Sequence, residues 1–108
     1  MRIQLTVPPN TDPSAPVKLS TLYDDETLSQ QVIKVPLGHA YLTGVQIHAA
    51  GVGRIVPEKG SNTDWLIDDD RVIVKNVFVK ISPPSFNVEV RAYNTDDTYE
   101  HTFYIDLT

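Results

Sequence analysis

Short stretches in which apolar and polar residues alternate recur along the chain, and they constrain its fold more than any other feature. An alternation of period two places one set of side chains on each face of a strand, whereas a helix requires apolar residues three or four positions apart. The pattern is clearest at 2–7, 86–93 and 99–107. The sequence therefore predicts an all-β protein.

The composition supports the same conclusion. Valine, isoleucine and threonine make up 31 of the 108 residues, and these branched side chains pack better on a pleated sheet than in a helix. Alanine occurs only five times, and eight prolines and five glycines interrupt most windows long enough for a helix. We expect one domain, 1–108, folded as an antiparallel β-sandwich of about seven to nine strands with jelly-roll or Ig-like (immunoglobulin-like) topology.

Two segments near the C-terminus make this expectation more specific. The apolar alternation of 71–81 slips by one position at Lys75-Asn76, so we expect a bulge or a change of sheet there. The residues 82–85 then end that strand. The turn-forming run 94–98 separates the last two strands, which we expect to form a hairpin. The stretch 64–70 fits either a short strand or one helical turn.

The segment 8–16 has its own composition. It contains four prolines together with short polar residues, which favours extended backbone outside the sheets. Two interpretations stay open. The segment is either an arm that reaches a neighbouring subunit or a plain connection between two strands.

Net charge and hydropathy exclude several classes of function. The formal charge is −5, which disfavours a domain whose main task is to bind nucleic acid. No apolar run is long enough to span a bilayer, and the first residues lack the apolar core of a signal peptide, so we expect no membrane association. The lack of cysteine excludes disulfide frameworks and cysteine-based zinc sites.

No group of residues carries a catalytic or metal-binding motif. His39, His48 and His101 fall on different predicted elements without metal-ligand spacing, and His101 lies on the predicted core side of its strand, as a structural histidine would. Acidic runs at 24–26, 68–70 and 96–97 lack the layout of a calcium loop, and solvated turn residues are the favoured interpretation. The sequence thus predicts no cofactor and no enzyme.

Aromatic residues are the remaining candidates for binding. Tyr23, Trp65, Tyr93 and Tyr104 fall at loops or on polar-side positions, where they could be exposed and could stack on a sugar or anchor a protein partner. Trp65 is the best candidate for such a surface. The alternative is that Trp65 fills the edge of the core.

Three segments carry a resemblance to known proteins. They are the opening 6–11 with its two prolines, the stretch 44–51 with its continuation to Pro57, and the ending 88–102. Together they resemble small β-sandwich accessory proteins of tailed-phage-like virions. The resemblance spans most of the chain, and its motifs are structural.

This resemblance implies a non-enzymatic role in the virion, after assembly in the host cytoplasm. The protein would decorate or stabilise a capsid or fibre by contacting the major capsid protein or another virion protein. It would form a homo-oligomer, with Pro8 and Pro9 in the arm that reaches a neighbour. The alternative function is a carbohydrate- or protein-binding module, and a metal-dependent enzyme is a third, weaker possibility.

Overall fold

The computed structural model describes residues 1–25, 27–80 and 86–108, and this part of the chain contains ten strands and no helix. All strand pairs are antiparallel and the longer strands form two sheets, so the predicted all-β sandwich is confirmed, with ten strands where seven to nine were expected. Eight strands have four or more residues, and the other two have two each. The strands are β1 Arg2–Val7, β2 Val17–Tyr23, β3 Thr27–Leu28, β4 Gln31–Val35, β5 Thr43–Ala49, β6 Gly53–Val56, β7 Arg71–Lys75, β8 Val79–Lys80, β9 Phe86–Asn94 and β10 His101–Leu107.

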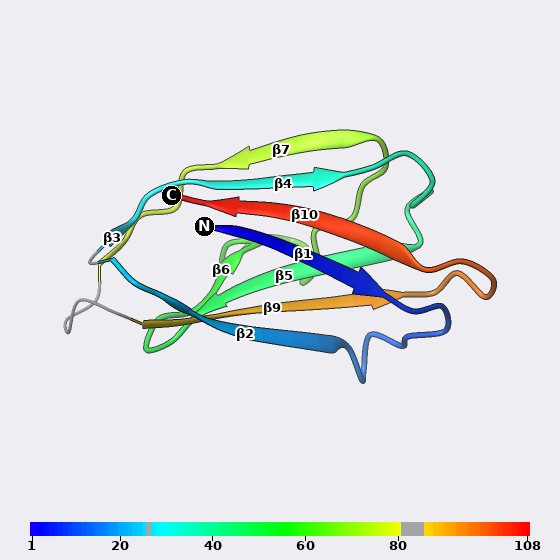
Figure 1. Ribbon diagram of the computed structural model, residues 1–108, viewed down its shortest axis with the longest axis horizontal. Coiled ribbons are helices and arrows are strands. Elements are labelled where there is room, and N and C mark those ends of the chain that lie inside the picture. The colour runs from blue at the N-terminus through cyan, green and yellow to red at the C-terminus, as the bar shows by residue number, and fades with distance from the viewer. Residues whose placement is uncertain (26, 81–85) are drawn as a thin grey trace.

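The longer strands form two four-stranded sheets that face each other (Figure 1). Sheet A has the order β1-β10-β4-β7, and sheet B has the order β2-β9-β5-β6. The first strand pairs with the last, the second with the second-last, and so on through β3–β8 and β4–β7 to β5–β6. The chain is therefore one long antiparallel ribbon, rolled up so that β10 pairs with β4 and β9 with β5. This is a jelly-roll arrangement, which decides between the two expected topologies.

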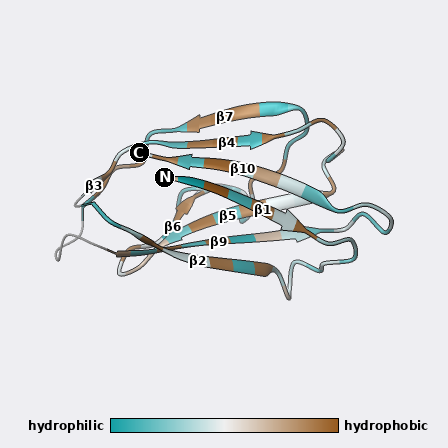
Figure 2. Ribbon diagram, viewed as in Figure 1, coloured by the Kyte–Doolittle hydropathy of each residue, from teal (hydrophilic) through white to brown (hydrophobic). Residues whose placement is uncertain are grey.

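The core lies between the inner faces of the two sheets, as the alternation predicts. In β1, Ile3, Leu5 and Val7 are buried, and the residues between them are exposed. In β10, Phe103, Ile105 and Leu107 are buried in the same way. Sheet B contributes a matching set, which includes Val45, Ile47, Val88 and Val90. Figure 2 shows that β7 also carries apolar residues although it is an edge strand, and Val72 and Val74 on it are exposed.

The predicted final hairpin is wrong. β9 belongs to sheet B and β10 to sheet A, so the run 94–98 carries the chain across the sandwich. The Asn94 side chain holds this crossing, because its Nδ2 donates to the carbonyls of Val7 (3.2 Å) and Tyr99 (2.8 Å). Its Oδ1 accepts from the Asp96 amide at 3.0 Å. An Asx turn of this kind can redirect a chain to the opposite sheet as well as back to its own.

The predicted irregularity at Lys75-Asn76 is a change of sheet. β7 ends at Lys75 in sheet A, and the chain continues as β8, which pairs with β3 outside both large sheets. The stretch 64–70 forms neither of the expected elements, since it contains only a single bridge from Leu66 to Val45. The expected strand end at 82–85 and part of the acidic run 24–26 lie outside the described residues.

Candidate functional site: the loop end

One end of the sandwich is built from loops that contact one another. We call it the loop end; it comprises residues 8–16, 36–42, 67–70 and 95–100 and lies on the right in Figure 1. The backbone amide of Asn10 donates to the carbonyl of Asp96 at 2.9 Å. The amide of Thr95 donates to the carbonyl of Leu42 at 2.9 Å, and that of Gly38 donates to Asp69 Oδ1 at 3.0 Å. Each loop is thus held by another loop.

A buried histidine anchors the loop 36–42 from below. His39 Nε2 lies 3.1 Å from the carbonyl of Thr102, and its Nδ1 lies 2.7 Å from the hydroxyl of Thr43. Because a carbonyl can only accept, Nε2 carries the hydrogen and Nδ1 accepts from Thr43. The ring also packs against Phe103, with centroids 4.8 Å apart. Burial lowers the pKa of His39, which favours this neutral form.

A second histidine anchors the loop 95–100. His101 Nε2 donates to Asp96 Oδ2 at 2.9 Å, and Asp96 Oδ1 accepts from the amides of Thr98 (2.9 Å) and Tyr99 (3.2 Å). The hydrogen bond from His101 is the main reason that the pKa of Asp96 is lowered. The ring centroids of His39 and His101 are 4.7 Å apart, so the two histidine rings are in contact. His101 has the structural role that its position in the sequence predicts.

These polar groups do not form a metal site in the described part of the chain. His48 is remote from the other two histidines, on the outer face of sheet B, where its Nε2 lies 3.0 Å from Gln46 Oε1. Within residues 1–25, 27–80 and 86–108, no group of three or more His, Asp or Glu side chains is arranged to hold a metal ion. In the same residues, no helix is long and apolar enough to cross a membrane.

Unusual backbone conformations are concentrated at the loop end. Four described residues other than glycine have positive φ, namely Asn10 (57°), Ala40 (50°), Tyr41 (61°) and Asp70 (47°), and all four lie there. A positive φ is rare for an aromatic residue, and it persists only where the surrounding structure fixes it. Such strain tends to occur at functional sites.

The loop end also exposes large apolar side chains. Leu37 is 75% exposed, Tyr41 66% and Tyr99 68%. None of the three was among the expected binding residues, and Tyr99 was expected to begin the last strand, 99–107. An apolar residue beside a turn glycine, as in Leu37-Gly38, is the signal that could have indicated exposure. Exposed aromatic side chains such as Tyr41 and Tyr99 often carry much of the binding energy at protein interfaces.

The expected exposure of Tyr23 and Tyr93 is wrong. Tyr23 is buried on the inner face of β2, with its ring centroid 5.3 Å from that of Phe86. Tyr93 is also buried, because Trp65 covers it edge-on at 4.9 Å. Trp65 itself is half-buried against Tyr93 on the outer face of sheet B, so it is neither a fully exposed platform nor part of the core cluster. Tyr104 is exposed on the outer face of sheet A, as expected.

The segment 8–16 belongs to the loop end and joins β1 to β2. Pro8 is exposed and Pro9 is half-buried. Thr11 exchanges two backbone hydrogen bonds with Asn94, at 2.8 and 3.0 Å, so the segment lies against its own domain. In this conformation it is a connection that contributes surface to the loop end.

Comparisons with known proteins find similarity in structure and none in sequence. No family model and no curated protein matches the sequence. Among solved structures, that of infectious bursal disease virus, Gt strain, is similar to this chain, with a TM-score of 0.48 and 13% sequence identity. The alignment covers 99% of this chain and 29% of the viral one, so this chain spans less than a third of that protein.

Proposed function

We propose that this protein is a non-enzymatic structural component of a virion and binds other virion proteins through its loop end. The observation that carries the proposal is the set of exposed apolar side chains, Leu37, Tyr41 and Tyr99, on loops that are fixed from below by His39 and His101. The three side chains lie on two loops joined by the Thr95–Leu42 hydrogen bond, and exposed apolar side chains on neighbouring loops favour a partner more than a single isolated one does.

The rigidity of these loops strengthens the proposal. Association is opposed by the entropy lost when flexible loops become ordered, and loops that are already hydrogen-bonded to one another lose less. The loop end is cross-linked by the Asn10–Asp96, Thr95–Leu42 and Gly38–Asp69 hydrogen bonds. Its exposed side chains are therefore presented in one arrangement, which suits a permanent contact in an assembled particle.

The fold is compatible with this role without assigning it. Jelly rolls are used by viral capsid proteins and by lectins, so the architecture fits both the proposed function and its alternative, a carbohydrate- or protein-binding module. We propose the major capsid protein, or another virion protein, as the partner, with the chain decorating a phage capsid or fibre. Self-association into a homo-oligomer through the exposed edge strand β7 would be compatible with binding through the loop end.

Sedimentation with assembled particles tests the proposal. The chain is produced from the genome that encodes it, and the particles that assemble are separated on a density gradient. We expect the wild type to sediment with the particles. A variant carrying Leu37→Ala, Tyr41→Ala and Tyr99→Ala should remain at the top of the gradient, unbound. Phe78→Ala is the matched control, because Phe78 is 64% exposed in the β7–β8 connection at the opposite end (Figure 1).

The outcomes separate clearly. Circular dichroism and thermal melting must show that the triple variant is folded, which we expect because all three side chains are exposed. A wild-type chain that never sediments with particles would overturn the virion role. A triple variant that sediments as well as the wild type would exclude the loop end as the contact surface.

A further inference from the structure

The outer face of sheet A carries a second surface, which shares only Pro36 with the loop end. Side chains of paired residues point to the same side of a sheet, so the strand register defines rows across it. One row runs Gln4, Tyr104, Lys34 and Val72, and the next runs Arg2, Asp106, Val32 and Val74. Aromatic, polar and charged groups thus lie together on a rigid support.

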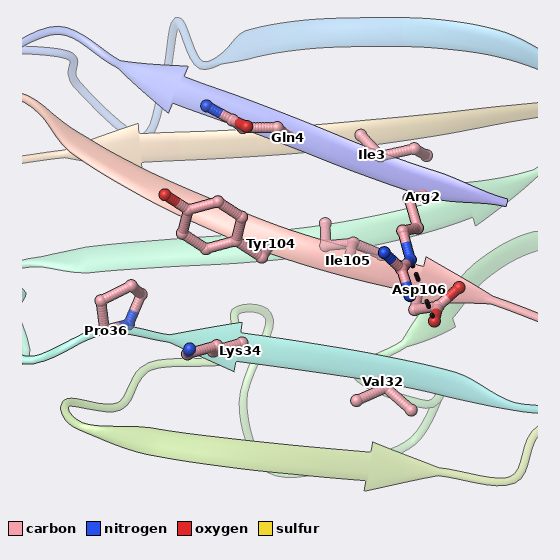
Figure 3. A pocket seen from close by; sticks show the side chains of 9 residues that line it. All are labelled: Arg2, Ile3, Gln4, Val32, Lys34, Pro36, Tyr104, Ile105 and Asp106. Atoms are coloured by element: carbon pink, nitrogen blue, oxygen red, sulfur yellow. Dashed lines mark ion pairs between the residues drawn. The ribbon is translucent and has the colours of Figure 1, made fainter.

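This face is hollowed at its centre. A groove of about 910 Å³ lies over β1, β10 and β4, within the size range of small-molecule sites, about 300–1,000 Å³. Figure 3 looks onto the groove and shows the Tyr104 ring between Gln4 on one side and Lys34 and Pro36 on the other. Tyr104 is 43% exposed, so its ring is available to a ligand.

The side chains around this ring favour a saccharide. The face of an aromatic ring packs well against the C–H groups of a sugar, and Val32 and Pro36 extend this apolar floor. Gln4, Arg2 and Asp106 supply donors and acceptors at the rim, as hydroxyl groups require. A few polar groups around an apolar floor are the usual composition of a small-ligand site.

The charges select an acidic saccharide. Two cations, Arg2 and Lys34, line the groove against one carboxylate, Asp106, in a protein whose net charge is −5. Asp106 forms an ion pair with Arg2, in which Arg2 Nε lies 4.0 Å from Asp106 Oδ2. Lys34 forms no ion pair with any described residue, and it is the direct cross-strand neighbour of Tyr104. A sugar stacked on Tyr104 would therefore place a carboxylate or sulfate within reach of the Lys34 ammonium.

We propose that the groove on the outer face of sheet A binds an acidic oligosaccharide, with Tyr104 as the stacking platform and Lys34 as the partner of the sugar's anionic group. This activity goes beyond the proposed structural role, and its two central residues, Tyr104 and Lys34, lie outside the loop end. A particle component with both surfaces could attach to the virion by its loop end and present the groove to an external glycan.

A glycan array tests this inference directly. The array displays oligosaccharides that bear uronate, sialate or sulfate groups beside their neutral counterparts, and the best binder is then titrated by calorimetry. We expect acidic members to bind and neutral ones to bind more weakly. Tyr104→Ala should weaken binding about tenfold, and Tyr104→Phe should retain it, because the stacked ring stays. Lys34→Gln should reduce the preference for the acidic member by about two- to fivefold.

The control variant is Phe78→Ala, which removes an exposed aromatic ring that lies outside both the groove and the loop end and should leave saccharide binding unchanged. Tyr104 lies on the solvent side of the sheet, so its substitution should lower Tm by only a few degrees and leave the protein folded. The inference is overturned if no acidic saccharide binds, if neutral counterparts bind equally well, or if Tyr104→Ala binds like the wild type. None of these results bears on sedimentation with particles, so the two proposals fail separately.

Discussion

An alanine in place of Gly44 should destabilise this protein strongly, because position 44 lies beneath a buried aromatic ring. Gly44 in β5 is the cross-strand neighbour of Tyr93 in β9. A methyl carbon at position 44 would lie 2.8 Å from Cζ of Tyr93 and still closer to Cε2. Tyr93 cannot move freely, since the Trp65 ring packs edge-on against it at a centroid distance of 4.9 Å.

The size of the effect follows from these contacts. Inserting a methyl group into a packed core costs about 1–3 kcal/mol. Displacement of the Tyr93 ring also weakens its pairing with Trp65, which contributes about 0.5–1.5 kcal/mol beyond its buried area. We therefore expect Gly44→Ala to lower the free energy of unfolding by roughly 2–4 kcal/mol, which corresponds to a fall in Tm of roughly 10–20 °C for a domain of this size.

Urea denaturation followed by tryptophan fluorescence is the appropriate assay, because Trp65 is the single tryptophan and reports on this contact. The control is the same substitution in a Tyr93→Ala background, where the obstacle is gone. There Gly44→Ala should cost less than about 0.5 kcal/mol, since the two sites are coupled only through the ring. Equal unfolding midpoints for the wild type and the Gly44→Ala variant would refute this reasoning.

Three further predictions concern the core and the loop anchors. Burial lowers the pKa of His39 from its usual 6.5, so the unfolded state binds the proton more readily and the free energy of unfolding should fall as pH drops below about 6.5. In urea titrations at pH 7 and pH 5, the His39→Gln variant should lose less unfolding free energy than the wild type, and an equal loss would contradict this role. Phe103→Ala should cost about 3–5 kcal/mol because Phe103 is fully buried, and a loss below 1 kcal/mol in denaturant melts would argue against the described core. Asn94→Ala should cost about 1–3 kcal/mol because it removes the donor to the carbonyls of Val7 and Tyr99, and Asn94→Asp, which keeps the shape but not the amide, should cost a similar amount. If denaturant melts show no loss of stability for Asn94→Ala, the crossing does not depend on this side chain.

The sequence predicts which faces of the strands are buried better than it predicts which strands are neighbours. The alternation in β1 and β10 identifies Ile3, Leu5, Phe103 and Ile105 as core residues, because the side-chain period of a strand is a local property. The pairing of β9 with β2 and β5, rather than with β10, depends on how the whole ribbon rolls. A turn-forming sequence such as the one at Asn94 is compatible both with a hairpin and with a crossing to the opposite sheet.

The aromatic residues show a similar limit. Tyr23 continues the alternation Val17, Leu19, Thr21 along the inner face of β2, so its burial could have been inferred from the pattern. Tyr93 lies on the outer face of sheet B, and no local pattern reveals that Trp65, distant in sequence, covers it. Likewise, the loop end brings together residues from four separate segments, and only the rolled ribbon places them side by side.

The rolled ribbon also determines the order in which this protein can fold. β5 and β6 are separated by a short turn, whereas β1 and β10 join Arg2 to Asp106 across nearly the entire chain. Closing a longer loop costs more entropy, so hydrogen-exchange labelling should find the β5–β6 amides protected first and those of β1 last. Until that final pairing forms, the inner strands present open edges to other molecules. Nascent chains are therefore most prone to aggregate while the outermost strands are still unpaired.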